Sequence, residues 1–254
     1  YAGVTNKLLA KKACTICVAY EGMERFFPRE KIVLTGNPVR QNLLTNSVSR
    51  EEAVEYFHLD PQKKTILVLG GSLGARTINQ TLQAAIPIMQ EHPEVQWIWQ
   101  TGKIYIEQVK NAISEITGEI VMGTRVGALP NLYVTDFIKD MSKAYAAADL
   151  VISRAGAGSI SEFCLLHKPV ILVPSPNVAE DHQTKNALAL VNKEAALYVK
   201  DADAQKELVQ TALHTVGDEE KLSSLSREIA KLALPDSANV IAHYVLDLIK
   251  KNKQ

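Results

Sequence analysis

Two glycine-rich stretches of the sequence carry the residue types and spacing that could bind a phosphate. GGSLGARTIN, residues 70–79, follows a run of aliphatic residues and precedes a helical pattern, and SRAGAGSISE, residues 153–162, has the same surroundings. A glycine-rich turn from strand to helix presents backbone N–H groups and the positive end of the helix dipole to an anion. The candidate ligands are therefore a dinucleotide, an ATP-like triphosphate or a sugar nucleotide.

The first stretch departs from the two commonest nucleotide motifs. A dinucleotide fingerprint needs G-x-G-x-x-G and an acidic residue about 20 positions later. Here Ser72 replaces the second glycine, and the next expected strand ends in Gln100 and Thr101. A P-loop needs a lysine after its last glycine, but Ala75 follows Gly74. The pattern argues against both motifs, and a tight turn without a ligand is the simplest alternative.

The second stretch offers a carboxylate as well as an anion site. Gly156 and Gly158 let the backbone approach a diphosphate closely, and Ser159 can donate a hydrogen bond. Glu162 has two interpretations. It could close a capping box with Ser159, which is a structural role, or its carboxylate could accept from both hydroxyls of a ribose.

Polar residues open two further helices. Asp181, His182 and Gln183 can donate to and accept from the hydroxyls of a sugar, although Asp181 could simply cap its helix. Asp201 and Asp203 form a D-x-D pattern, which holds a metal in some glycosyltransferases. Because the pair lies between a strand and a helix, we expect helix capping here and no metal site.

The elements that must position these residues alternate between strand and helix from residue 64 onward. Parallel sheets in such chains bind ligands beyond the carboxyl ends of their strands. The sequence therefore predicts an α/β fold with a Rossmann-like, doubly wound, parallel six-stranded sheet. The six expected strands are TILVL (65–69), VQWIW (95–99), LYVTD (132–136), LVISR (150–154), PVILVP (169–174) and ALYVK (196–200).

The flanking segments predict a remnant of another unit and a final helix. Residues 1–37 contain a helical run, KLLAKKA, and two strand-like runs, TICVAY and IVLTG, which are too few to close a core alone. Ser49 to Glu52 forms a capping box before a short helix, and an amphipathic helix follows Pro235. We therefore expect a remnant at 1–37, a ligand-binding domain at 38–235 and a terminal helix at 236–254. Because the chain starts at Tyr1 without methionine, we expect part of a longer protein.

Composition limits the partners and the compartment. The chain has 254 residues, of which 28 are Lys or Arg and 28 are Asp or Glu, so no overall field attracts nucleic acid. Cys14 and Cys17 form a C-x-x-C without a second ligand pair, and we expect all three cysteines to be buried, reduced thiols. The sequence shows neither a signal peptide nor an apolar run as long as a membrane span.

Four stretches together carry a family resemblance. TGNPVR, GGSLGARTIN, SRAGAGSISE and DHQTKNA resemble the bacterial N-acetylglucosaminyltransferases that convert lipid I to lipid II in peptidoglycan synthesis. The resemblance covers essentially the whole chain. It implies the two-domain GT-B fold, with UDP-GlcNAc bound mostly by the C-terminal domain, and no cofactor or metal.

The resemblance also assigns parts of UDP-GlcNAc to residues of these motifs. It implies Arg40, the loop of Gly71 and Ser72, and the backbone of Ala157, Gly158 and Ser159 for the diphosphate, Phe137 and Ile138 for the uracil, Glu162 for the ribose, and His182 and Gln183 for the GlcNAc hydroxyls.

The reaction implied is an inverting transfer of GlcNAc to the 4-hydroxyl of MurNAc in lipid I. The catalytic base and the contact with the membrane surface would belong to the N-terminal domain, of which only residues 1–37 are expected here, with Asn6 lining the cleft. The protein would then act at the cytoplasmic side of the bacterial cell membrane, and this chain alone would be inactive. Alternatives are another UDP-sugar GT-B enzyme, such as a glycolipid glycosyltransferase or a UDP-GlcNAc 2-epimerase, or a nucleotide-sugar-binding domain without catalysis.

Overall fold

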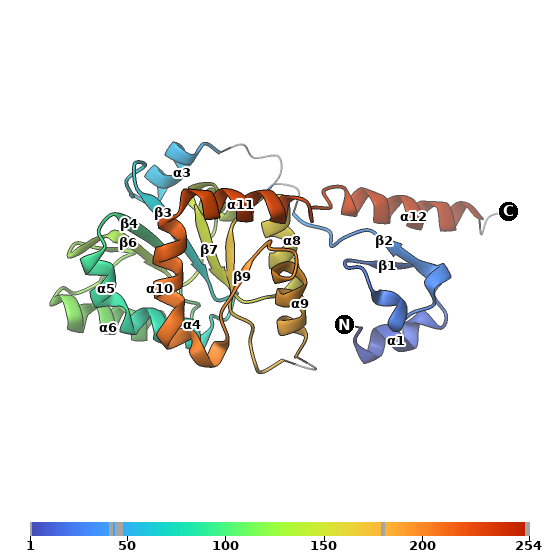
Figure 1. The fold of residues 1–254 in the computed structure, drawn as a ribbon, viewed down its shortest axis with the longest axis horizontal. Helices are drawn as coiled ribbons and strands as arrows, with labels where there is room; N and C mark the ends of the chain where they lie inside the picture. Colours follow the sequence, from blue (N-terminus) through green and yellow to red (C-terminus); the bar gives the residue numbers. More distant parts are fainter. Residues whose placement is uncertain (1, 41–42, 44–47, 179–180, 252–254) are drawn as a thin grey trace.

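A central sheet organises most of the chain. The structure is a computed structural model, and it describes residues 2–40, 43, 48–178 and 181–251. Within these residues, one sheet has seven strands in the order β5-β6-β4-β3-β7-β8-β9, with helices on both faces (Figure 1). Its strands are β3 (Lys64–Leu69), β4 (Val95–Gln100), β5 (Arg125–Val126), β6 (Leu129–Thr135), β7 (Leu150–Ser153), β8 (Val170–Leu172) and β9 (Leu197–Tyr198).

The strand order confirms the doubly wound prediction. The six expected strands are β3, β4, β6, β7, β8 and β9, all of them pair in parallel, and in chain order they lie as 3-2-1-4-5-6. This is the Rossmann order, whose direction reverses between the first and fourth strands, here β3 and β7. The count of six was wrong for the described sheet, because β5 adds an antiparallel edge strand. Two residues are too short to give a periodic signal.

The strands are covered on both faces, which explains their continuous apolar sequences. In β3, Ile66 and Val68 belong to one buried cluster, while Leu67 and Leu69 belong to the other. The first cluster includes side chains from α4 (Arg76–Ala84), α5 (Ile86–Glu91), α6 (Ile106–Thr117) and α10 (Ala204–Gly217). The second includes side chains from α3 (Arg50–Tyr56), α7 (Met141–Ala147), α8 (Ala157–Leu165), α9 (His182–Val191) and α11 (Glu219–Ala230).

The predicted cap before α3 is present. Ser49 is the N-cap residue, and its hydroxyl accepts the backbone N–H of Glu52 at 3.1 Å. This bond satisfies one of the N–H groups that the first helical turn leaves free.

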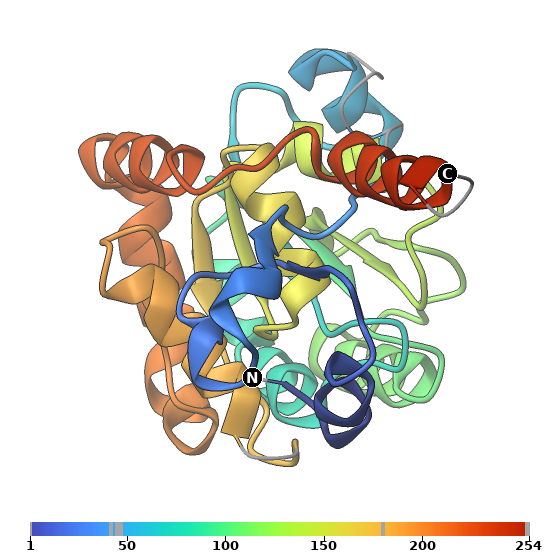
Figure 2. The same cartoon turned by 90° about the vertical axis from the view of Figure 1, so that its right-hand side faces the viewer.

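The N-terminal residues form a small unit with its own cluster. It contains α1 (Val4–Ala10), β1 (Ile16–Val18), η1 (Met23–Arg25), η2 (Arg29–Lys31) and β2 (Ile32–Leu34), and β1 pairs in parallel with β2. In Figure 2 this unit lies in front of the sheet domain. Cys14 and Cys17 are exposed here, so the expectation of buried thiols was wrong for both, although Cys164 in α8 is buried.

The last element that the structure describes is the predicted amphipathic helix, α12 (Ser237–Lys251), which extends past β2 (Figure 1). Its start packs tightly on Gly36, where an added Cβ would lie 2.4 Å from the Ser237 hydroxyl. Farther along, Tyr244, Val245 and Ile249 are exposed. Within the described residues, the helices are all too short or too polar to cross a membrane.

Candidate functional site

Both glycine-rich loops lie at the point where the order of the strands reverses, between β3 and β7. Leu69 at the end of β3 pairs with Ser153 at the end of β7, and each strand runs through its loop into α4 or α8. The N-cap residues, Ala75 and Gly156, make no side-chain cap hydrogen bond. Two helix N-termini with N–H groups uncapped by side chains therefore meet at one edge, as an anion site requires.

The first loop needs its glycines because it passes close to the loop after β4. Gly71 and Gly74 both have φ +80°, in the left-handed region. A Cβ on Gly74 would lie 2.1 Å from the carbonyl oxygen of Thr101, and one on Gly102 would lie 2.4 Å from the Gly74 nitrogen. The turn can keep this position only without side chains at these residues.

A cavity of about 560 Å³, which we call the edge cavity, lies between the two helix N-termini. Three of the predicted site residues, Gly71, Ser159 and Gln183, line it. Ser175 in the loop after β8 also lines it, and its backbone N–H donates to Gln183 Oε1 at 2.9 Å. The loops after β3, β7 and β8 therefore share one polar cavity.

The edge cavity is also lined by a partly buried charge pair that the sequence did not predict. Arg154 forms an ion pair with Asp201 and donates to the carbonyl oxygens of Val173 at 3.0 Å and Pro174 at 3.2 Å. The second oxygen of Asp201 accepts the Thr77 hydroxyl at 2.8 Å. These bonds connect the loop after β7, the end of β8 and the first turn of α4, so they fix the distance between the two helix N-termini.

The D-x-D pattern is explained by this pairing. We expected Asp201 to cap a helix, and this expectation was wrong. Asp201 lies in η4 (Asp201–Asp203), and its carboxylate pairs with Arg154 and accepts the Thr77 hydroxyl. Asp203 occupies the N-cap position of α10, but its side chain makes no cap hydrogen bond. Among the residues that the structure describes, His, Cys, Asp and Glu side chains form no group of three or more that could hold a metal.

Gln100, at the end of β4, connects the first glycine loop to the predicted uracil contacts. Its Nε2 donates to the Gly71 carbonyl oxygen at 3.2 Å, and its Oε1 accepts the Ile138 N–H at 3.0 Å. Phe137 is 47% exposed, whereas Ile138 is buried. The Ile138 N–H is thus bonded within the protein, and its side chain belongs to the core.

Glu162 is held by residues from two other segments. The Tyr145 hydroxyl donates to its Oε2 at 2.6 Å, and the Arg40 guanidinium lies 3.3 Å from its Oε1. The capping-box interpretation was wrong, because α8 begins after Gly156 and Ser159 is already its third residue. Arg40 contacts this carboxylate and does not line the edge cavity.

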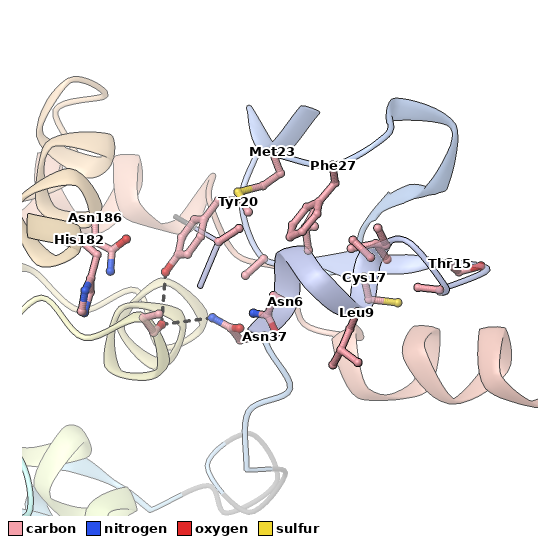
Figure 3. A pocket seen from close by; sticks show the side chains of 17 residues that line it. Asn6, Leu9, Thr15, Cys17, Tyr20, Met23, Phe27, Asn37, His182 and Asn186 are labelled. Carbon is pink, nitrogen blue, oxygen red and sulfur yellow. Dashed lines mark hydrogen bonds between the residues drawn. The ribbon is translucent and has the colours of Figure 1, made fainter. Parts of the chain in front are cut away.

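A second cavity of about 540 Å³, the interdomain cavity, separates the N-terminal unit from α8 and α9 (Figure 3). Asn6, as predicted, and His182 line it. Tyr20 and Asn37 each donate to the Ala157 carbonyl oxygen at 3.4 Å. Burial raises the pKa of Tyr20 to about 12, so its hydroxyl remains a donor.

Three remaining residues that the sequence singled out, Ser72, Gly158 and Asp181, line neither cavity. Ser72 and Gly158 are exposed. Asp181 has φ +51°, and its carboxylate accepts the Thr184 hydroxyl at 2.6 Å instead of a backbone N–H. At the start of α9, His182 lines the interdomain cavity and its neighbour Gln183 lines the edge cavity.

Comparison with known proteins shows the family to which this chain is similar. Residues 65–241 match the glycosyltransferase family 28 C-terminal domain. A curated protein of Bacteroides fragilis, named UDP-N-acetylglucosamine–N-acetylmuramyl-(pentapeptide) pyrophosphoryl-undecaprenol N-acetylglucosamine transferase, is 66% identical over 252 residues, 99% of this chain and 64% of that protein. A protein of the same name from Flavobacterium psychrophilum is 47% identical over 253 residues, 100% of this chain and 65% of that protein. The chain thus spans about 64% of the length of the curated relatives it matches.

Solved structures agree with this family. The crystal structure of Acinetobacter baumannii MurG has a TM-score of 0.69 and 28% identity, covering 98% of this chain and 64% of that one. A UDP-GlcNAc 2-epimerase from Neisseria meningitidis, solved bound to UDP-GlcNAc, has a TM-score of 0.63 and covers 95% of this chain and 63% of that one. Its 13% identity shows a shared fold only.

Proposed function

The chain belongs to glycosyltransferase family 28 and has the α/β architecture of a GT-B C-terminal domain, and from this premise we propose its function. It forms the donor-binding part of an enzyme that transfers GlcNAc from UDP-GlcNAc to the 4-hydroxyl of MurNAc in lipid I, which gives lipid II. The names of relatives at 66% identity support this substrate pair.

One observation carries the proposal: the edge cavity lies between the helix N-termini that follow β3 and β7. Sheets of this topology bind ligands at such a switch point, and uncapped helix N-termini stabilise a phosphate. A nucleotide diphosphate fits this position because the cavity of about 560 Å³ has a polar lining drawn from three loops.

We assign the parts of the donor from the family resemblance to residues in and near the loops that surround this cavity, and of these residues Gly71, Ser159 and Gln183 line it. Glu162 accepts from the ribose, and the uracil lies beside Phe137 and Ile138 in the loop after β6. The proposed diphosphate contacts are Gly71, Ser72 and the backbone of Ala157, Gly158 and Ser159, with Arg40 turning from Glu162 toward the phosphates.

The sugar would extend from the edge cavity toward the interdomain cavity. Gln183 lines the first and His182 the second, so the two side chains can contact different hydroxyls of one GlcNAc. The acceptor hydroxyl would approach from the interdomain cavity. UDP then departs on the side away from the acceptor. The negative charge that develops on its diphosphate lies at the helix N-termini, which stabilise it.

The proposed reaction requires groups beyond those assigned here. A base removes the proton of the acceptor hydroxyl as it attacks, and we assign it to the N-terminal part of the longer relatives. The undecaprenyl-linked acceptor places the reaction at a membrane surface, so we propose a peripheral protein at the cytoplasmic side of the bacterial cell membrane.

Calorimetry with UDP-GlcNAc, UDP-glucose and UDP, with and without EDTA, tests the donor proposal. We expect UDP-GlcNAc to bind most tightly and EDTA to leave its affinity unchanged, since Arg154 and Thr77 already pair with Asp201. Binding of none of the three ligands would contradict the proposal. Binding that disappears with EDTA would contradict its metal-free form.

A UDP-GlcNAc 2-epimerase is the alternative to exclude, because such an enzyme shares the fold of this chain, with a TM-score of 0.63 and 13% identity. The two activities give different products. Incubation of an intact relative, such as the Bacteroides fragilis protein, with UDP-GlcNAc alone would form the 2-epimer if the family acted as an epimerase, whereas a transferase needs a lipid I analogue for turnover.

A further inference from the structure

Tyr145 is a buried polar side chain that the proposed donor site does not yet use. It lies on α7, is 2% exposed, and its ring meets Phe163 of α8 edge to face with ring centroids 6.0 Å apart. Its hydroxyl donates to Glu162 Oε2 at 2.6 Å. A short bond from a packed ring to a carboxylate on another helix fixes the carboxylate in place.

The two oxygens of Glu162 consequently have different surroundings. Oε2 is bonded to Tyr145 from the protein interior, whereas Oε1 faces Arg40, whose side chain is 58% exposed. Burial raises the pKa of Tyr145 far above its usual range, so its hydroxyl remains a donor. A ligand can therefore replace the exposed arginine at Oε1 while the buried bond stays.

A free glutamate side chain has three rotatable bonds, and a ligand that uses it must immobilise them. This ordering lowers affinity by an amount that a preorganised side chain avoids. The Tyr145 bond removes that cost before the ligand arrives. Two hydroxyls on adjacent carbons need a carboxylate in one fixed orientation, so a diol gains more from this bond than a single hydroxyl does.

We propose that Tyr145 is a positioning residue for sugar recognition, whose hydroxyl holds the Glu162 carboxylate so that it selects a ribonucleotide over a 2′-deoxyribonucleotide. The proposal rests on the proposed function, because it takes Glu162 as the ribose contact. Tyr145 itself need not touch the ligand.

Tyr145→Phe tests this proposal, since it removes one hydroxyl and keeps the ring against Phe163. Calorimetry would measure the affinity of the unchanged chain and the variant for UDP and for 2′-deoxy-UDP. We expect the variant to bind UDP about tenfold more weakly, as for loss of a hydrogen bond to a charged group. The preference for UDP over 2′-deoxy-UDP should fall by at least about threefold, because the deoxy ligand gains less from the fixed carboxylate.

Tyr133→Phe is a matched control, because this tyrosine also packs on a phenylalanine, Phe57, with ring centroids 4.9 Å apart. It lies within β6, so its variant should keep the UDP preference of the unchanged chain. In a Glu162→Gln background, Tyr145→Phe should change the preference little further, because the hydroxyl acts through the carboxylate.

The outcomes separate this inference from the proposed function. If the unchanged chain bound no UDP, the proposed function would be overturned and the inference with it. If UDP bound normally and Tyr145→Phe weakened both ligands equally, or neither, the inference alone would be overturned. Loss of folding in Tyr145→Phe would also overturn it, because the hydroxyl would then serve the fold instead of binding.

Discussion

At the scale of single residues, substitution of Glu162 tests whether its carboxylate contributes to ligand binding or to the fold. Glu162→Gln keeps the size of the side chain but removes the charge that ribose hydroxyls would donate to. We expect UDP-GlcNAc binding to weaken by about 1.5 to 3 kcal/mol, as for a hydrogen bond to a charged group. Calorimetry measures the affinity, and thermal melting should show little change, because the amide oxygen still accepts from Tyr145.

Glu52→Gln is the control for this prediction. Glu52 follows a genuine N-cap, Ser49, at the start of α3. Its variant should leave the affinity for UDP-GlcNAc unchanged. A lower melting temperature with unchanged affinity in Glu162→Gln would assign Glu162 to the fold and exclude it from the ribose site.

The partners of Glu162 illustrate what sequence reasoning missed. Ser159 and Glu162 have the spacing of a capping box, but the N-cap residue of α8 is Gly156, three positions before Ser159. Tyr145 and Arg40 lie 17 and 122 positions away in sequence. A local pattern cannot report contacts between segments that only the folded sheet brings together.

At the scale of elements, the loop after β3 depends on Gly74. Gly74→Ala would put a Cβ 2.1 Å from the Thr101 carbonyl oxygen at a residue with φ +80°. We expect a loss of at least about 2 kcal/mol in the free energy of unfolding, since both strain and a backbone clash oppose the alanine. Denaturation with urea measures it. Gly123→Ala is the control, because nothing lies within 4 Å of its added Cβ.

The η4 segment supports a second prediction, which distinguishes a structural tie from a metal site. Asp201→Ala leaves Arg154 without its ion-pair partner in a mostly buried position, so we expect a loss of about 2 to 3 kcal/mol in the free energy of unfolding. Asp203→Ala should change it much less, because its side chain makes no cap bond. Equal losses that appear only in the absence of EDTA would indicate a metal held by both aspartates.

The alternation of strands and helices predicted most of the fold, because a parallel sheet covered on both faces needs continuous apolar strands. It also located the edge of the sheet where the glycine loops meet. It did not predict β5, which has only two residues and, within the described sheet, pairs with β6 alone, in antiparallel orientation. Gln100 and Arg154 were not assigned either, because each acts through carbonyl or amide groups of other loops.

At the scale of the whole molecule, contacts at α8 connect the donor site to the N-terminal unit. Tyr20 and Asn37 both donate to the carbonyl of Ala157, in the helical turn that the donor's diphosphate would face. Lys193 and Glu21 form a further, exposed ion pair 3.8 Å long. Exposed pairs stabilise weakly, so we expect the hydrogen bonds at Ala157 to set the orientation of the N-terminal unit.

The last prediction is that these 254 residues, produced alone, bind UDP-GlcNAc but do not form lipid II, whereas an intact relative such as the Bacteroides fragilis protein does both. Transfer requires the acceptor hydroxyl to be aligned with the anomeric carbon, and this alignment supplies a large part of the rate. The chain spans 64% of that relative's length, and the exposed side chains of Val245 and Leu246 on α12 leave an apolar surface that the rest of a longer protein could cover. Transfer of labelled GlcNAc to a lipid I analogue, at matched concentrations of the two proteins, measures the difference. Comparable rates would show that the catalytic base lies within these 254 residues and that its assignment to the N-terminal part of the relatives is wrong.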